Sequence, residues 1–231
     1  MSLPVTVIIA ARNEEEAVTA AVRSAFESGA AEVIVADGGS TDRTRQAAAS
    51  AGARVIECQP MRARQYNRAA ETAANEALVF LHADTLLPAG AGAAVLDALQ
   101  RAPFGGFRLR FAEQAWKLRL AAFLINLRTR LTLSPWGDQA QFIRRATFLR
   151  DGGFREIPLM DDYELAVRMR RRGRPIVLPL TVITSGRRFL RLGLLRTTAM
   201  NWTIVIAWRL GVSEERLAGW YRERENGNGE C

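Results

Sequence analysis

The chain has 231 residues, 48% of them hydrophobic and 24% charged, with a formal net charge of +8. This length and apolar content suit one large folded domain, or a core with an appendage, and they exclude wholesale disorder. The positive charge comes mostly from arginine and favours anionic partners: nucleotide phosphates, nucleic acid or an acidic membrane surface. The two cysteines, Cys58 and Cys231, form no disulfide or metal motif, and the first residues do not resemble a secretory signal. Both observations suit a cytoplasmic protein.

Strands and helices alternate in the first part of the chain. The strands are expected at 5–11, 32–37, 53–57 and 78–81, and the helices at about 15–28, 41–50 and 63–75. The first strand is a continuous β-branched run, which is typical of a strand buried on both faces. This alternation predicts an α/β sandwich with a mostly parallel central sheet and right-handed crossovers.

Polar side chains follow the carboxyl ends of two of these strands. Asp37 follows the second strand, and His82 and Asp84 follow the fourth. Ligands of open α/β sheets bind at this edge, although a polar turn after a core strand would leave the same pattern. Neither the dinucleotide-binding glycine motif nor a P-loop is present. A bound nucleotide would therefore need a cation for its phosphates, and Asp84 could hold one.

Four segments in order, 7–15, 35–42, 62–67 and 81–84, resemble family 2 inverting glycosyltransferases of the GT-A fold. The resemblance covers about residues 4–186. It implies a Rossmann-like catalytic domain over 1–186 that binds a nucleoside-diphospho-sugar donor. Residues 187–231 are expected to form a helical C-terminal appendage.

The resemblance also implies roles for single residues. A metal motif of the form Asp-x-Asp corresponds to His82-Ala83-Asp84, which would carry Mn²⁺ or Mg²⁺ with histidine in place of the first aspartate. A histidine packed beneath the sheet edge is the alternative. The residues implied to bind the nucleotide are Ala11, Arg12, Glu14, Asp37, Arg64 and Asn67.

A second motif lies further along the chain, where Asp161 and Asp162 open a predicted helix that ends at Gly173. Acids in a first helical turn are favourable with the helix dipole whatever their function. The pair also resembles the family's Glu-Asp motif, which makes Asp162 the catalytic base and puts Asp161 in place of the usual glutamate. By the same resemblance, a turn carrying Asp138 and Gln139 lies beside the sugar or the acceptor.

Two further helices mix basic and apolar residues. The pattern at 116–133 favours a core-facing helix with a solvated basic stripe, although a basic, apolar-backed surface near an acceptor lipid would also fit. The uncharged stretch 197–208 is too short to span a membrane. Its flanking arginines and tryptophans slightly favour an interfacial helix over a core helix. The polar tail 223–231 is expected to be disordered.

The sequence thus predicts an inverting, metal-assisted transfer of a sugar to an acceptor hydroxyl, with an aspartate as base. The acceptor stays open, with a lipid-linked one among the alternatives, and the location is cytoplasmic or peripheral on the inner membrane face. Two other functions remain: a nucleotidyltransferase on a similar sheet, and a non-catalytic basic module that binds membrane or nucleic acid. No nucleic-acid-binding motif is recognisable, which argues against a nucleic-acid partner.

Overall fold

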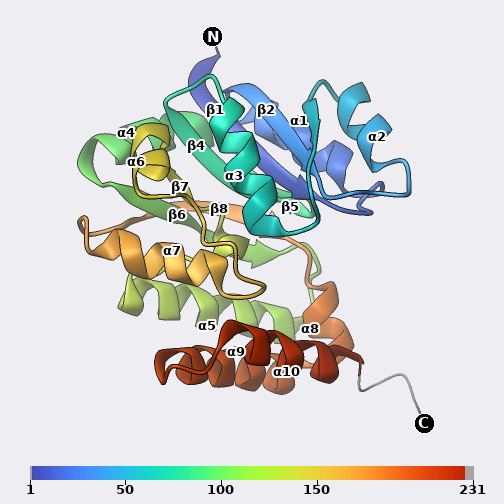
Figure 1. Cartoon of the computed structure of the whole chain (residues 1–231), viewed down its shortest axis with the longest axis vertical. Coiled ribbons are helices and arrows are strands. Elements are labelled where there is room, and N and C mark those ends of the chain that lie inside the picture. Colours follow the sequence, from blue (N-terminus) through green and yellow to red (C-terminus); the bar gives the residue numbers. More distant parts are fainter. Residues whose placement is uncertain (1, 227–231) are drawn as a thin grey trace.

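The computed structural model describes residues 2–226, and within them one eight-stranded sheet runs through the molecule in the order β3-β2-β1-β4-β7-β6-β8-β5 (Figure 1). Neighbours from β3 to β4 are parallel, β6 is parallel to β8, and β7 and β5 run antiparallel to their neighbours. The predicted mostly parallel α/β sheet is therefore confirmed. The strands are β1 (Leu3–Ala11), β2 (Ala30–Asp37), β3 (Arg54–Glu57), β4 (Ala77–His82), β5 (Thr85–Leu86), β6 (Phe104–Phe111), β7 (Phe142–Arg144) and β8 (Ile176–Thr184).

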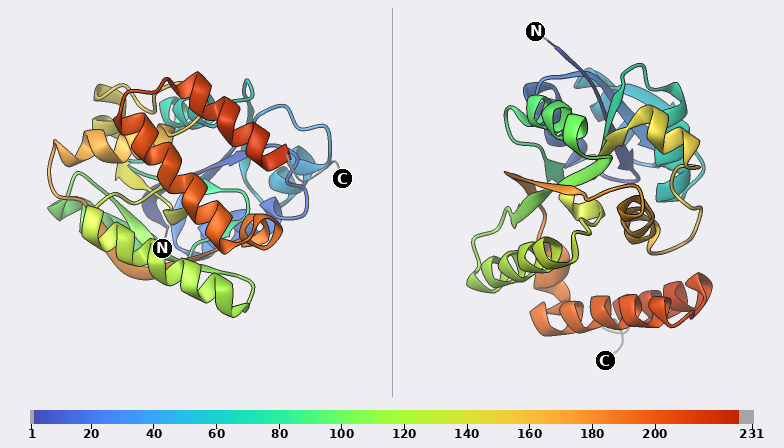
Figure 2. Two further views of the ribbon diagram at one scale, coloured as in Figure 1. Left: turned by 90° about the horizontal axis from the view of Figure 1, so that it is seen from below. Right: turned by 90° about the vertical axis from the view of Figure 1, so that its left-hand side faces the viewer.

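Helices cover both faces of this sheet, and further helices lie beyond one of its edges (Figures 1 and 2). The three helices expected in the N-terminal part are present, each within a few residues of its predicted bounds. The helices are α1 (Val18–Glu27), α2 (Thr44–Ser50), α3 (Arg62–Thr72), α4 (Ala91–Arg101), α5 (Trp116–Thr132), α6 (Arg145–Arg150), α7 (Asp161–Arg170), α8 (Arg187–Leu192), α9 (Leu194–Arg209) and α10 (Glu214–Asn226), with a 3-10 turn, η1, at Gly137–Gln139.

Strand β1 shows why its sequence is apolar without interruption. Val7 and Ile9 belong to the core that β1 shares with α1 and α4, whereas Ile8 belongs to the core on the opposite face, with α3, α6 and α7. Alternate side chains of a strand point to opposite faces, so burial on both faces requires apolar residues at every position. The carboxyl end of β1 lies between Asp37 of β2 and His82 of β4.

The C-terminal helices are attached through a third apolar cluster. It contains Tyr163 of α7, Ile204 of α9 and Leu217 of α10, among others. Arg209 Nε also donates a hydrogen bond to the Tyr163 hydroxyl at 2.8 Å, so α9 is fastened directly to α7. The prediction of a disordered tail is wrong for 223–226, which continue α10, and the rest of that tail lies outside the described residues.

Helix α5 differs from its preferred interpretation as a core-facing helix. It does bury Leu118, Ala121 and Ala122, but its opposite face exposes large apolar side chains. The exposed residues are Trp116, Leu120, Phe123, Leu124, Leu127 and Leu131. Within residues 2–226, no helix combines the length and apolarity needed to span a bilayer.

Candidate active site

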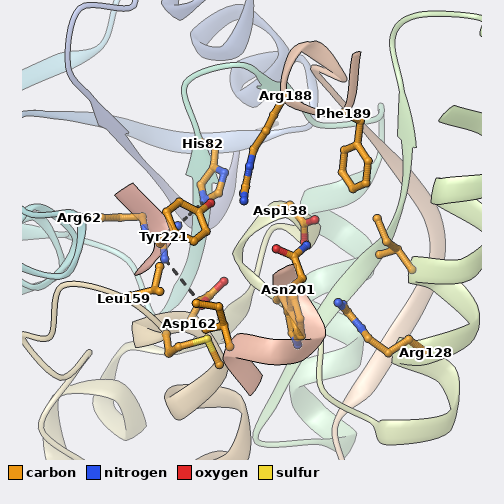
Figure 3. A pocket seen from close by; sticks show the side chains of 14 residues that line it. Arg62, His82, Arg128, Asp138, Leu159, Asp162, Arg188, Phe189, Asn201 and Tyr221 are labelled. Atoms are coloured by element: carbon orange, nitrogen blue, oxygen red, sulfur yellow. Dashed lines mark hydrogen bonds and ion pairs between the residues drawn. The ribbon is translucent and has the colours of Figure 1, made fainter. Parts of the chain in front are cut away.

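Two hollows meet at the carboxyl ends of β1 and β4. The first, the strand-end groove, has a volume of about 320 Å³, and the second, the central cavity, has a volume of about 170 Å³. Arg62 and His82 line both, so they mark the junction. The strand-end groove is lined by Ala10, Ala11, Arg12, Glu14, Arg62, Gln65, His82, Ala83, Asp84 and Arg187. Figure 3 shows the side chains around the central cavity.

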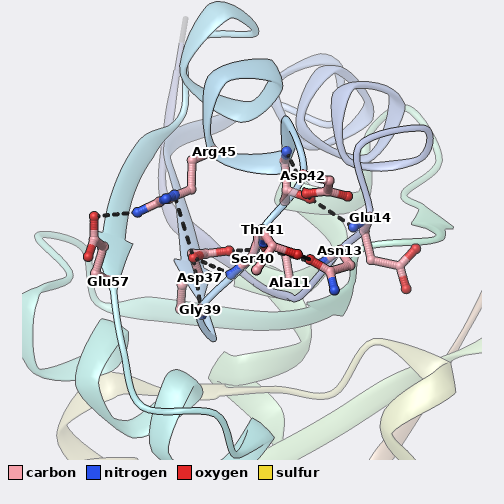
Figure 4. Close-up of polar contacts among 12 residues, drawn as sticks. Ala11, Asn13, Glu14, Asp37, Gly39, Ser40, Thr41, Asp42, Arg45 and Glu57 are labelled. Carbon is pink, nitrogen blue, oxygen red and sulfur yellow. Dashed lines mark hydrogen bonds and ion pairs between the residues drawn. The ribbon is translucent and has the colours of Figure 1, made fainter.

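The loops after β1 and β2 hold each other in place at one end of the groove (Figure 4). Asn13, with a left-handed φ of 54°, accepts the Thr41 N–H through its side chain at 2.9 Å, and its own N–H donates to Ser40 Oγ at 2.9 Å. Asp37 is fully buried and accepts the N–H groups of Gly39 and Ser40 at 3.1 and 3.0 Å. Asp37 therefore shapes the turn that follows it, and its carboxylate does not face the solvent.

Arg62 connects the two motifs identified in the sequence. Its Nε donates to Asp161 at 3.1 Å, its Nη2 forms an ion pair with the same carboxylate, and Asp162 Oδ1 lies 3.7 Å from Nη2. Its Nη1 lies 3.4 Å from His82 Nε2. Since a guanidinium can only donate, this nitrogen of His82 accepts and carries no proton. Burial and the charge of Arg62 lower the pKa of His82, which keeps the imidazole neutral.

Asp162 faces the central cavity from the first turn of α7. Its two carboxylate oxygens accept the N–H of Gly137 at 2.6 Å and its neighbour's N–H, from Tyr163, at 2.8 Å. Burial alone would raise the pKa of Asp162, but Arg62 and these two donors outweigh it and lower the pKa. Asp162 is therefore ionised at neutral pH, as a proton acceptor must be before it acts.

Two features of the backbone fix the position of Asp162. A Cβ on Gly137 would lie 2.9 Å from Asp162 Oδ2 and 3.0 Å from His82 Nε2, so a larger residue there would displace one of these two side chains. Met160, immediately before α7, has a left-handed φ of 72°, which costs a non-glycine residue about 1–2 kcal/mol. This turn starts the helix where Asp161 and Asp162 both reach Arg62. Strain of this kind gathers at functional sites.

Asp138 and Arg128 also line the central cavity (Figure 3). Burial raises the pKa of Asp138 to about 6, against the opposing charge of Arg128. The Arg128 guanidinium stacks on Trp136, with 3.6 Å between its carbon and the ring centroid. Among the described residues, Asp138 Oδ1 and Arg128 Nε are buried without a hydrogen-bond partner. Both atoms therefore have unused hydrogen-bonding capacity beside the cavity.

Asp84 lies in the strand-end groove beside a cation of the chain itself. Arg187 Nη2 is 3.4 Å from Asp84 Oδ2 and 2.8 Å from Glu14 Oε1. Among the side chains that the structure describes, no three His, Cys, Asp or Glu residues gather as a complete metal site. Mg²⁺ is often held by one or two carboxylates together with substrate phosphates. Asp84 fits a cation of that kind, shared with a diphosphate.

The structure brings many of the predicted site residues together. Ala11, Arg12, Glu14, His82 and Asp84 line the groove, and His82, Asp138 and Asp162 line the central cavity. Asp161 is not among the residues that line the cavity, and its carboxylate accepts a hydrogen bond from Arg62.

Four other predicted residues line neither hollow. Asp37, predicted to bind the nucleotide, is buried and bonded to its own turn. Arg64 and Asn67 line a separate hollow, where Arg64 pairs with Glu156 and Asn67 exchanges two hydrogen bonds with the backbone of Phe154. Gln139 is fully buried and binds the carbonyl of Phe107.

Several lining residues were not singled out from the sequence. Arg62 lies in the same motif as Arg64, and only the helical rotation decides which of the two faces the groove. No local sequence signal distinguishes three other lining arginines from ordinary surface arginines: Arg128, Arg187 and Arg188. The helices that follow residue 186 thus complete the site, since Arg187 lines the groove and Arg188, Asn201 and Tyr221 line the cavity.

Comparison with known proteins bears on the family and the fold. The family model described as Glycosyl transferase family 2 matches residues 6–152. No curated relative matches the chain. The crystal structure of S. aureus TarS 1–349 superimposes with a TM-score of 0.62 and 17% identity, covering 99% of this chain and 73% of that chain. Glucosyl-3-phosphoglycerate synthase from Mycobacterium tuberculosis, in complex with Mg²⁺ and UDP, gives 0.61 and 19%, covering 91% and 80%. At these identities the two structures establish the fold, and the predicted GT-A fold is confirmed.

Proposed function

Because the chain belongs to glycosyl transferase family 2, we propose that it moves a sugar from a nucleoside-diphospho-sugar to an acceptor hydroxyl with inversion at the anomeric carbon. The observation that carries this proposal is the junction at Arg62 and His82. There a groove fit for a nucleotide meets a cavity that contains an ionised carboxylate, Asp162.

The donor would lie along the strand-end groove. Its nucleoside is assigned to the end near Ala11 and Arg12, and its diphosphate to the end near Asp84 and Arg187. Asp84 would hold a divalent cation, Mn²⁺ or Mg²⁺, which would offset the charge that develops on the departing diphosphate. Structures of the similar M. tuberculosis synthase contain UDP with Mg²⁺ or with Mn²⁺, which supports a nucleotide bound together with a divalent cation.

The sugar would then project past His82 into the central cavity. Asp162 accepts the proton of the acceptor hydroxyl while that oxygen forms a bond to the anomeric carbon. The bond between this carbon and the diphosphate oxygen breaks, and its electron pair leaves with the nucleoside diphosphate. A single displacement from the opposite face inverts the anomeric configuration, and no glycosyl-enzyme intermediate forms.

Arg62 has two tasks in this step. It keeps Asp162 ionised in a buried place, and its Nη1 lies at the junction where the leaving diphosphate gains charge. A guanidinium fixed in advance at such a point stabilises the transition state without reorganisation. Asp161 holds Arg62 and is assigned a positioning role, because its carboxylate is bound to that guanidinium.

A thermal-shift panel of nucleoside diphosphates and their common sugars, each with Mn²⁺, Mg²⁺ or a chelator, tests this proposal. A ligand that binds the folded state raises the melting temperature by mass action. We expect one nucleoside diphosphate to do so at sub-millimolar concentration, and more strongly with a cation. No shift from any of them at millimolar concentration with cation present would contradict the proposal.

A further inference from the structure

An apolar groove lies between α5 and α9, next to the central cavity. It has a volume of about 300 Å³ and shares no lining residue with the strand-end groove. The residues that line both this groove and the central cavity are Ile125, Arg128, Trp136, Phe189 and Asn201. The two spaces are therefore adjacent, and a ligand lying across this shared boundary would contact both.

The walls of this α5–α9 groove are aliphatic and aromatic. Leu127 and Leu131 of α5 are 40% and 74% exposed, and Trp202 of α9 is 47% exposed. Outside the groove, the same two helices expose Phe123 and Ile206. Contiguous apolar surface of this kind marks an interaction site in a protein that is otherwise folded around buried cores. Aliphatic walls along a groove suit a hydrocarbon chain.

The boundary between the central cavity and the α5–α9 groove, here called the seam, carries the guanidinium of Arg128. Arg128 lies there, flat against Trp136, and its Nη2 donates to Thr129 Oγ1 at 3.1 Å and Gln139 Oε1 at 3.2 Å. Its Nε is buried with no partner among the described residues. An anionic group at the seam would pair with the Arg128 guanidinium in competition with Asp138, whose carboxylate lines the same cavity. Arg188 adds a second guanidinium to the cavity wall.

We infer that the acceptor is an amphiphile with an anionic headgroup, whose headgroup enters the central cavity beside Arg128 and whose hydrocarbon chain lies in the α5–α9 groove. This inference rests on the proposed function, because the acceptor oxygen must reach Asp162 through the same cavity. The exposed apolar side chains of α5 and α9, with Lys117 and Arg130 on α5, face the lipid surface that supplies the amphiphile.

Dodecyl phosphate below its micelle concentration is a suitable probe, titrated into the full chain by calorimetry. Dodecyl maltoside serves as the neutral amphiphile and inorganic phosphate as the headgroup without a chain. Leu127→Glu places a charge in the groove at a half-exposed position that folding tolerates. Leu149→Glu is its matched control, since Leu149 of α6 is 38% exposed and lies outside the groove. Thermal melts of both variants check that each is folded.

We expect saturable binding of dodecyl phosphate to the parent and to Leu149→Glu, and binding at least tenfold weaker to Leu127→Glu. Inorganic phosphate and dodecyl maltoside should each bind the parent at least tenfold more weakly than dodecyl phosphate. Arg128→Gln should abolish the preference for the phosphate over the maltoside headgroup. Equal binding by the two leucine variants would overturn the inference. So would a groove occupied by a second copy of the chain, seen as a dimer that Leu127→Glu dissociates without any change in amphiphile binding.

Nucleoside diphosphate binding, measured on the same samples, separates the two proposals. If the nucleotide binds the parent and Leu127→Glu equally while dodecyl phosphate binds neither, the acceptor class is wrong and the proposed function stands. If no nucleotide binds the parent, the proposed function fails, and the role of the groove as an acceptor site fails with it.

Discussion

The guanidinium of Arg62 lies 3.7 Å from the carboxylate of Asp162, although one residue belongs to α3 and the other to α7. The same guanidinium is bound to Asp161 and reaches His82, so one cation faces two carboxylates and a neutral imidazole. Asp161 and Asp162 are largely buried, with side chains 4% and 17% exposed. The charges of this cluster depend on one another, and Arg62 is its centre.

Replacing Arg62 with glutamine should therefore destabilise the protein. Breaking a fully buried ion pair costs about 3–5 kcal/mol, and we expect about 2–4 here because a third of the Arg62 side chain is exposed. Arg62 lowers the pKa of Asp162, so this stabilisation is present above the ordinary carboxyl pKa and is lost as the pH falls. Urea denaturation over a pH series should show the full difference between parent and variant at pH 7, and the difference should shrink only as the pH falls below the ordinary carboxyl pKa and through the lowered pKa of Asp162.

Arg64→Gln is the matched control on the same helix. Arg64 pairs with Glu156 on the surface, and such exposed pairs contribute about 0–1 kcal/mol. If Arg64→Gln were as unstable as Arg62→Gln, the buried cluster around Arg62 would contribute no more to the free energy of unfolding than an exposed ion pair does.

Asp162→Asn tests the proposed base. The amide keeps the size of the side chain but cannot take a proton, so sugar transfer should fall about 10²–10⁴-fold, the usual contribution of a positioned base. Binding of the nucleoside diphosphate should change little, because Asp162 faces the central cavity and not the strand-end groove. Transfer to the acceptor, or to water where no acceptor is added, is the measurement. Parental turnover by the variant would exclude Asp162 as the base.

Asp138→Asn should change stability in a pH-dependent manner. Burial raises the pKa of Asp138 from 3.8 to about 6, so its favourable contribution is present below pH 4 and is lost as the pH rises through 6. The neutral amide avoids that loss. The free energy of unfolding of the variant relative to the parent should rise by roughly 2 kcal/mol between pH 4 and pH 8. Asp97→Asn is the control, because Asp97 forms an exposed pair with Arg101, and it should show no such rise. An equal rise in both variants would contradict the raised pKa of Asp138.

His82→Leu removes the acceptor of Arg62 Nη1 from the junction of the two hollows. Without this partner Nη1 is no longer held at the junction, and a candidate cation ligand is lost with the imidazole, so nucleotide binding with cation present should weaken. His82→Asp should retain binding, since a carboxylate can pair with Arg62 and hold a cation. Titration of the nucleotide at fixed Mn²⁺ distinguishes these outcomes. If His82→Leu behaved like the parent, the histidine would serve only for packing.

The N-terminal half of the fold could be predicted from the sequence because its strands are continuous apolar runs with turn residues between them. In the other half, the helices at 116–133 and 161–173 could be predicted, but the order and pairing of the strands could not. β5 and β7 have two and three residues, too few for a periodic pattern, and their antiparallel pairing is decided by contacts distant in sequence.

The candidate site divides in the same manner. His82, Asp84 and Asp162 are marked by strand ends and a helix start, features that sequence reveals. Arg62 and Arg64 differ by two helical positions, about 200° of rotation, so the motif containing both cannot say which of them faces the groove. Arg128 and Arg187 reach the site only through tertiary packing, and nothing near them in the sequence indicates it.

Calorimetric titration of the best nucleoside diphosphate into the parent, Asp84→Asn and Asp162→Asn, each with Mn²⁺ and with a chelator, tests the central claim most directly. The account predicts that Mn²⁺ tightens binding to the parent and to Asp162→Asn equally. Asp84→Asn should bind at least tenfold more weakly with Mn²⁺. With chelator it should bind as well as the parent or better, because Arg187 is released from its ion pair with Asp84. Parental affinity of Asp84→Asn in Mn²⁺, or no effect of Mn²⁺ on the parent, would contradict a cation-assisted nucleotide site at the end of β4.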